Sequence, residues 1–144
     1  MIRFKKIRVI SNAVSSKFVR YSAMEWKTYY DSRMVLYRRT HKMWVISNDS
    51  DPLCVIGTIK KSFLGCGIEI YFFLCEAGQK QLKSLVKFLR KAFRRVVKLY
   101  KIVTVSIDVS FELGQRFIKF FGFAEEQHEF TAGETTFKHF YLRA

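Results

Sequence analysis

The sequence is short, strongly basic and rich in apolar side chains, and these properties exclude several classes of protein. Its 144 residues suffice for one domain, and because 49% of them are hydrophobic, burial can hold the fold without disulfides or metals. The same composition excludes a disordered chain. The formal net charge of +14 exceeds the value of about 2–8 that solubility of a small domain requires. The charge therefore indicates a polyanionic or acidic partner.

The cysteines indicate neither a disulfide framework nor a metal site. Cys54, Cys66 and Cys75 are odd in number, lie in apolar runs and form no Cys-x-x-Cys pair, and the histidines are scattered. We therefore expect reduced thiols in a cytoplasmic protein without a bound metal. No apolar run approaches the roughly 18 residues that a membrane-spanning helix needs, so no span is predicted.

The N-terminal part of the chain has the pattern of a strand followed by helix. Residues 2–10 alternate weakly between apolar and polar side chains, as a strand does. From Asn12 to about Arg39, apolar residues recur every three to four positions, which predicts one or two helices. Ser11 or Asn12 is the expected N-cap of the first helix.

Three short runs rich in β-branched and aromatic residues come next, at residues 42–47, 53–61 and 67–75. The turn-forming segments at residues 48–52 and 64–67 separate them. Runs of this kind with short turns between them predict a three-stranded antiparallel meander.

The strongest pattern predicts an amphipathic helix over residues 79–100. At about 100° per residue its apolar side chains fall on one arc and its lysines and arginines on the opposite arc. The stretch from Ala77 to Ile102 contains no acidic side chain. Lysines and arginines four residues apart repel one another, and a partner would relieve that repulsion. We therefore expect the helix to bind a partner through its basic residues, which are Lys83, Lys87, Arg90, Lys91, Arg94, Arg95 and Lys98.

The rest of the chain predicts one more helix among strands. Residues 101–109 have the β-branched content of a buried strand, and residues 111–123 form a short helix that Gly122 ends. Two strands, at 123–130 and 135–143, close the chain around a turn. The order β-α(α)-β-β-β-α-β-α-β-β predicts the α/β class, with a mixed sheet and helices on both faces.

This order, together with the segment "RFIKFFGF" at residues 116–123, resembles the GNAT superfamily of acyl-CoA-dependent N-acyltransferases. In that family a strand, a short helix with an aromatic-rich ending and two final strands follow the central helix. The resemblance implies a single GNAT-like domain over residues 1–144.

The resemblance also implies a cofactor loop of the pattern Arg/Gln-x-x-Gly-x-Gly/Ala at the start of the central helix. Backbone N–H groups of such a loop bind the pyrophosphate, and glycine lets it approach. The matching stretch here runs from Gln79 to Ser84, with Leu82 in place of the glycine. Leu82 is expected to turn into the core. If the chain binds acetyl-CoA, Gln79, Lys80 and Gln81 are the residues expected to hold its phosphates.

The catalytic positions that the resemblance implies are largely replaced. Ile118 stands where the family has a tyrosine that acts as general acid, and an isoleucine cannot donate a proton. Phe111 stands where an asparagine often opens the same helix. Glu69 occupies the strand before the central helix, where a family member's base is often found. It is either that base or the solvent-facing residue of an alternating strand.

These replacements lead to two hypotheses about function. The first is a structural or interaction protein that keeps the GNAT-like fold, binds no cofactor and contacts DNA or an acidic protein through its basic helix. The basic helix and the "RFIKFFG" segment also resemble small GNAT-like internal virion proteins of short-tailed phages, which implies a virion component. The second hypothesis is an active N-acetyltransferase that uses acetyl-CoA with a divergent pyrophosphate loop.

The partner of the basic helix is either an acidic protein or a nucleic-acid backbone. No helix-turn-helix, zinc-finger or RNA-binding motif is present in the sequence. Phe88 and Phe93 fall toward the apolar arc, so base stacking is not expected. Any bound nucleic acid is therefore expected to be held by its phosphates, without sequence reading.

Overall fold

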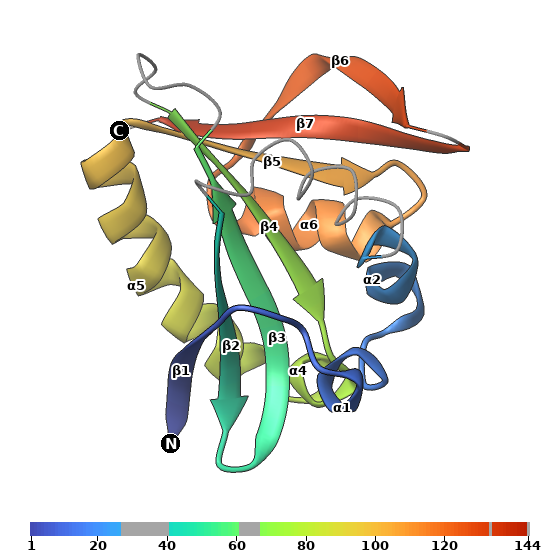
Figure 1. Ribbon diagram of the computed structural model, residues 1–144. Helices are drawn as coiled ribbons and strands as arrows, with labels where there is room; N and C mark the ends of the chain where they lie inside the picture. Colours follow the sequence, from blue (N-terminus) through green and yellow to red (C-terminus); the bar gives the residue numbers. More distant parts are fainter. Residues whose placement is uncertain (27–40, 61–66, 133, 144) are drawn as a thin grey trace.

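A computed structural model describes residues 1–26, 41–60, 67–132 and 134–143 of the chain. Its helices and strands follow one another in the order that the sequence predicts (Figure 1). The elements, in chain order, are β1 (Ile2–Ile7), α1 (Asn12–Ser15), α2 (Arg20–Glu25), β2 (Lys42–Asn48), β3 (Asp51–Ile59), β4 (Gly67–Leu74), α4 (Glu76–Lys80), α5 (Leu82–Tyr100), β5 (Ile102–Asp108), α6 (Glu112–Phe120), β6 (Ala124–Ala132) and β7 (Thr135–Arg143).

The strands form one mixed sheet, which confirms the predicted fold class. The order of its seven strands is β1-β2-β3-β4-β5-β7-β6. Strands β1 to β4 pair antiparallel, and so do β5 with β7 and β7 with β6. Strands β4 and β5 pair parallel, because the chain returns to the same edge of the meander through α4 and α5.

The parallel pair is only half formed. Strands β4 and β5 are paired from Gly67 and Ile102 as far as Ile70 and Val105. Beyond that point β4 continues to Leu74 and β5 to Asp108, and the two arrowheads point apart (Figure 1). The sheet therefore divides in its middle, and elements from both faces approach one another there.

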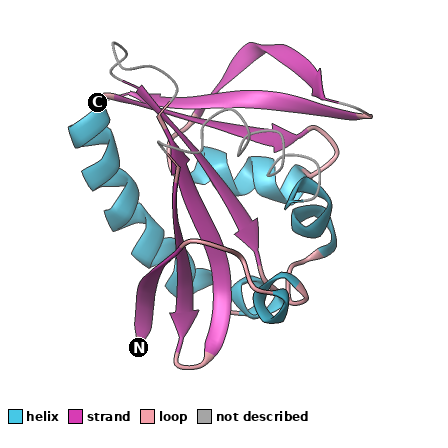
Figure 2. Cartoon of the chain, viewed as in Figure 1, coloured by secondary structure: helices cyan, strands magenta, loops and turns pink. Residues whose placement is uncertain are grey.

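Helices flank the sheet (Figure 2), and two apolar clusters of side chains cover its two faces. One contains Ile70 of β4 together with Leu85, Leu89 and Phe93 of α5, so α5 lies on this face with α6. The other contains Phe18 together with alternate residues of β4, such as Phe73. Successive side chains of a strand point to opposite faces, so the continuous apolar run of β4 contributes to both clusters.

Several local predictions are confirmed. The side chain of Ser11 accepts a hydrogen bond from the Val14 N–H, so Ser11 is the N-cap of α1. Gly122 has φ of +92°, the left-handed conformation that ends α6. Phe93 is buried and the half-buried Phe88 packs against the same cluster, so both rings lie on the apolar arc as predicted.

Some element boundaries differ from the prediction, most clearly in β1 and the central helix. Strand β1 ends at Ile7 rather than residue 10. The central helix starts at Glu76, earlier than residue 79, and is interrupted at Gln81, whose φ and ψ are −109° and 36°. The interruption lets α4 follow β3 closely, with the Cys75 N–H donating to the Leu53 carbonyl at 2.9 Å. Residues 27–39 of the predicted N-terminal helices lie outside the described residues.

Candidate functional site

An apolar cleft of about 400 Å³ lies between the start of α5, α6 and the unpaired half of β4. Lys83 and Arg116 supply its cationic side chains. Leu82 is half-buried and lines the cleft, so it does not turn into the core as the sequence predicts. The other lining residues are apolar or glycine: Phe72, Leu74, Val86, Phe111, Leu113, Gly114, Phe117 and Phe120.

A second cavity, of about 470 Å³, lies at the other side of Phe111. Phe111 and Leu113 line both cavities, so their side chains separate them. The Phe111 ring stacks on Tyr21 of α2, with centroids 4.9 Å apart and 12° between the planes. An aromatic wall therefore stands where the resemblance implies a polar asparagine.

The stretch from Gln79 to Ser84 does not form an open loop. The Gln79 N–H donates to the Cys75 carbonyl at 3.1 Å and the Gln81 N–H donates to the Ala77 carbonyl at 3.0 Å. The side-chain oxygen of Gln81 accepts from the Asn48 amide at 2.7 Å. The first N–H groups of α5 lack an acceptor within that helix, as at any helix N-terminus.

Gly78 serves packing rather than phosphate binding. A Cβ atom at this position would overlap the carbonyl oxygen of Leu53, so only glycine lets α4 lie against β3. The three residues expected to hold phosphates do not face one common site. Gln79 lines the second cavity, Lys80 is exposed, and the side chain of Gln81 bonds to Asn48.

A buried polar chain crosses the sheet just before the strands separate. Glu69 of β4 is only 2% exposed. The Ser106 hydroxyl of β5 lies 3.5 Å from Oε1 of Glu69 and 3.0 Å from Nδ1 of His139 on β7. Glu69 is therefore not the solvent-facing residue that one interpretation of the sequence expected. Because Glu69 alternates with Ile70, the chain lies on the face opposite the apolar cleft.

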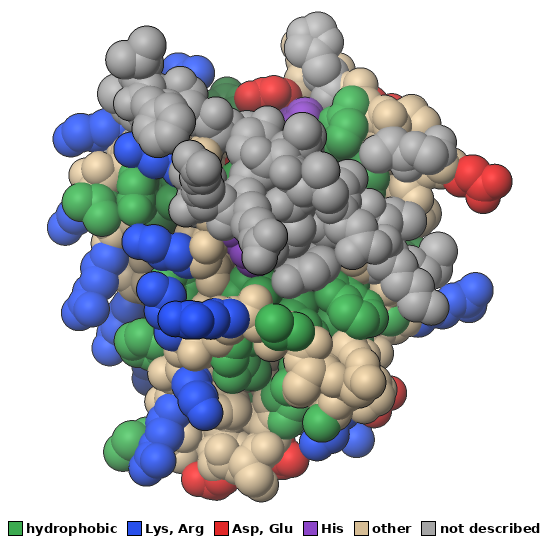
Figure 3. Space-filling model, viewed as in Figure 1, with side chains coloured by type: hydrophobic (Ala, Val, Ile, Leu, Met, Phe, Trp, Pro, Cys, Tyr) green, Lys and Arg blue, Asp and Glu red, His purple; other side chains and the backbone are tan. Residues whose placement is uncertain are grey.

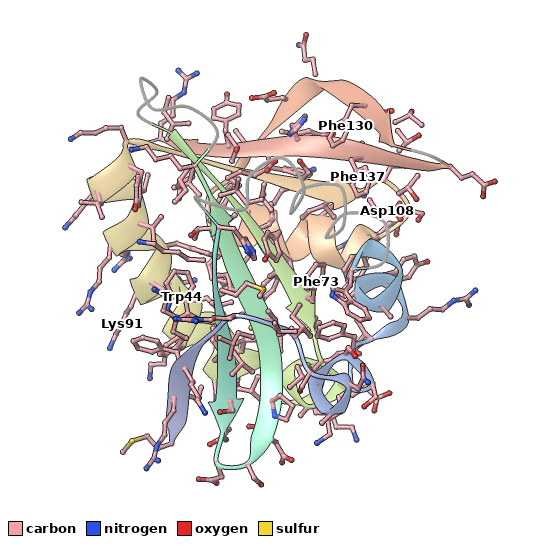
Figure 4. All side chains as sticks on the ribbon, in the orientation of Figure 1. Trp44, Phe73, Lys91, Asp108, Phe130 and Phe137 are labelled. Atoms are coloured by element: carbon pink, nitrogen blue, oxygen red, sulfur yellow. The ribbon has the colours of Figure 1, made fainter. Side chains whose placement is uncertain are left out.

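Aromatic rings cover the outer end of this chain. His139 stacks on Phe130 of β6 at 4.6 Å, and Phe130 stacks on Phe137 at 5.2 Å (Figure 4). The polar chain therefore leads from a buried carboxylate to a half-buried imidazole beside this aromatic cover.

Asp108, at the end of β5, accepts hydrogen bonds at 2.9 Å and 2.8 Å from the N–H and hydroxyl of Ser110.

A second polar pair lies farther across the same face. The Tyr71 hydroxyl and Nε2 of His41 form a hydrogen bond, and the two rings stack at 5.6 Å. A side chain at Gly57 would overlap the Tyr71 ring, so this glycine lets the ring cross β3. Burial lowers the pKa of His41, which favours the neutral imidazole.

Sequence reasoning missed Ser106, His139, Tyr71 and His41 as members of the site. One signal was present: Thr104, Ser106 and Asp108 alternate with apolar residues in β5, which marks a polar face. Their partners come from β4 and β7, and that pairing is set by the tertiary fold.

Neither residue 118, where the resemblance implies a general acid, nor the described cysteine thiols provide a catalytic group. Ile118 is fully buried in the core and has no group that could donate a proton. Burial raises the pKa of the Cys54 thiol, and it raises that of Cys75 to about 12. Both thiols are therefore poor nucleophiles. Cys66 lies outside the described residues.

The basic residues predicted to bind a partner lie away from the polar chain. Lys83, Lys87, Arg90, Lys91, Arg94, Arg95 and Lys98 are all exposed on α5. Lys91 projects outward from the helix (Figure 4), and only Lys83 reaches the cleft. Within the described ranges, none of these seven forms an ion pair with a carboxylate.

Lys87→Glu is expected to stabilise the protein by about 1 kcal/mol at low salt. Lys83 and Lys91 each lie four residues from position 87 and repel Lys87. A glutamate at that position would attract both of them. Thermal unfolding at low and high salt measures the effect, which screening should remove at high salt. Lys87→Gln is the control and should give roughly half the gain; equal gains would show that charge is not the cause.

The structure resembles solved N-acetyltransferases over nearly its whole length. A chimera of spermidine N-acetyltransferase SpeG from Vibrio cholerae with hSSAT superposes with a TM-score of 0.70 at 13% identity, covering 99% of this chain and 95% of the other. A point mutant of the Vibrio cholerae enzyme gives 0.68 at 10% identity, with 99% and 93% covered. The fold is the GNAT fold. Another structure of that enzyme, in complex with CoA and spermine, gives 0.60 at 13% identity, with 99% and 95% covered.

The comparisons by sequence add no family. Neither a protein-family model nor a curated protein sequence matches the chain. At identities of 10–13% the GNAT likeness is one of fold alone. None of the described helices is long and apolar enough to cross a membrane. The described residues contain no group of three or more histidine, cysteine or acidic side chains arranged to hold a metal.

Proposed function

We propose that this GNAT-fold protein is an acyl-CoA-dependent N-acyltransferase whose pyrophosphate site differs from the glycine loop of the family. The observation that carries the proposal is the position of Glu69, which is buried beside the point where β4 and β5 separate, with an apolar cleft on the opposite face. An acyl donor in the cleft and an amine on the other face would meet at this division of the sheet.

The residues present fit the cofactor in part. The cleft is apolar, as an acyl-pantetheine arm requires, and Lys83 and Arg116 lie at it to attract phosphates. The start of α5 offers N–H groups and Lys80 is exposed nearby, while Gln79 lines the adjoining cavity. Gln81 would contribute only after leaving Asn48. When bound, acyl-CoA supplies an activated acyl group as a thioester.

Glu69 is proposed as the general base. It would take the proton that the amine loses as its nitrogen forms the amide bond, while Ser106 and His139 hold the carboxylate in place. Loss of the tyrosine at position 118 is tolerable, because a thiol has a pKa of about 8.5 and its thiolate leaves without much help from an acid. The acceptor would be a primary amine, because the similar solved structures are spermidine N-acetyltransferases.

Calorimetry with acetyl-CoA tests the proposal, together with transfer of labelled acetyl groups to spermidine and other amines. We expect one molecule bound per chain, and transfer that requires the protein. Val86→Asp places a charge in the cleft and should abolish binding. Leu99→Asp, on the same helix at a 73% exposed position, is the matched control and should bind normally. If the unmodified protein neither bound acetyl-CoA nor transferred acetyl groups, the proposal would be rejected.

A second candidate is a structural or interaction protein, of which a virion component is one form. It is favoured by Leu82 in the cleft, by the buried Ile118 and by the exposed cations of α5. The solved structures named above are enzymes, so the virion setting stays a hypothesis from the sequence. The same titration separates the candidates, because this one predicts no acetyl-CoA binding.

A further inference from the structure

The chain has two sets of exposed cations that are far apart in sequence and adjacent in the fold. The first is the α5 set of seven defined above, from Lys83 to Lys98. The second lies in and just after β1 and consists of Arg3, Lys5, Lys6 and Arg8, all of them exposed. We call the two sets together the basic surface.

Packing of β1 against α5 joins the two sets. Strand β1 is the edge of the sheet next to β2, and its Phe4 ring lies 6.2 Å from the Phe88 ring of α5. In Figure 3 the lysines and arginines gather on the side of the molecule where Figure 1 places β1 and α5. Lys6 lies on the same face of β1 as Phe4, so a ligand long enough to follow α5 would also meet Lys6, whereas Arg3 and Lys5 point to the opposite face of this edge strand.

Among the described residues, no ion pair neutralises a cation of the basic surface. Where the structure describes the chain, its ion pairs join the N-terminus to Asp49, and Lys119 and Lys138 to Glu125. None of them involves a cation of the basic surface. Like charges repeated along α5 disfavour the helix, and a bound anion would remove that cost.

We propose that the basic surface binds the phosphate backbone of nucleic acid. Lysine is depleted at protein–protein interfaces, which place apolar anchors at their centre. Here seven cations line the exposed side of α5, and of the exposed apolar side chains Phe4 lies between the two sets while Phe120 lies beside Arg90. The ring of Phe120 already supports Arg90, whose guanidinium lies 4.9 Å from the ring centroid. A row of phosphates matches such a surface better than an acidic protein does.

Binding by phosphates alone has a distinct signature. Affinity should not depend on base sequence, and its logarithm should fall linearly with the logarithm of salt concentration. With about six or more phosphates neutralised, affinity should fall about 10³-fold or more between roughly 50 and 200 mM salt. The inference does not depend on the cleft or on catalysis, so it stands or falls separately from the proposed function.

The test is fluorescence anisotropy of a labelled duplex DNA titrated with the full chain over a range of salt. Lys91→Glu/Arg94→Glu on α5 should lower the slope by about two units, and Lys6→Glu on β1 should lower it by about one unit. The matched control is Lys17→Glu/Arg20→Glu, an equal change of charge at exposed residues of the α1–α2 region, and it should leave the slope unchanged. Circular dichroism establishes that each variant is folded.

Three outcomes would overturn the proposal. A flat salt response of the unmodified protein would exclude phosphate binding. An effect of the α5 pair without an effect of Lys6→Glu would show that β1 and α5 do not act as one surface. Tighter binding to poly-glutamate, or to phosphatidylserine vesicles, than to duplex DNA would assign the surface to an acidic protein or a membrane instead.

Discussion

Glu69→Gln should slow acyl transfer by about 10²–10⁴-fold while leaving the fold intact, because a general base typically contributes that factor. Glutamine has the size of glutamate and can still accept a hydrogen bond from the Ser106 hydroxyl, which lies 3.5 Å from Oε1 of Glu69. It cannot take a proton from an amine. The measurement is kcat and KM for acetyl-CoA and spermidine, with acetyl-CoA affinity measured separately by calorimetry.

Controls separate catalysis from structure. Glu134→Gln makes the same chemical change at an exposed residue of the turn between β6 and β7, and should leave kcat unchanged. Ser106→Ala and His139→Gln should lower kcat less than Glu69→Gln does, because these residues position the carboxylate and do not take the proton. Unchanged kcat in Glu69→Gln would remove Glu69 from the mechanism.

Gly78→Ala should destabilise the protein by about 3 kcal/mol, although alanine is normally the better helix former by about 1 kcal/mol. The new Cβ atom would overlap the Leu53 carbonyl and come within 3.0 Å of the Leu74 side chain. The obstacle is backbone, so it cannot rotate away. The Leu53 carbonyl also accepts from the Cys75 N–H at 2.9 Å, and that bond would be strained. Urea unfolding measures the loss as a lower midpoint.

Gly67→Ala is the matched control on the neighbouring strand. Its Cβ atom would lie 3.5 Å from the Ile102 carbonyl oxygen, which is ordinary contact. Stability should therefore stay within about 0.5 kcal/mol, or rise slightly because alanine restricts the unfolded chain. If both variants lost the same stability, close packing of α4 on β3 would not be the reason for glycine at position 78.

Local patterns made much of the fold readable from the sequence. The period of α5 fixed its apolar and basic arcs, and Leu85, Leu89 and Phe93 are buried as that period predicts. The turn formers after residues 47 and 131 placed the antiparallel pairs. These features depend on residues close together in the chain, where side-chain spacing translates directly into geometry.

The environment of each candidate residue was not readable in this way. Alternation alone allowed Glu69 to face solvent, but pairing of β4 with β5, and of β5 with β7, buries it beside Ser106. Leu82 lies on the predicted apolar arc, yet the break at Gln81 places it in the cleft. Each outcome depends on which distant strand or helix lies alongside, and a single sequence does not encode that in any local pattern.

Residue types and spacing predicted the order of strands and helices, the basic face of α5 and the replacement of the glycine, tyrosine and asparagine that the GNAT resemblance implies, because these are properties of neighbouring residues. The tertiary fold was needed to place Glu69 where β4 and β5 separate, to bring Ser106 and His139 to it, and to set Lys6 of β1 on the same face of the sheet as α5. The reason is that strand pairing and helix packing bring together residues tens of positions apart.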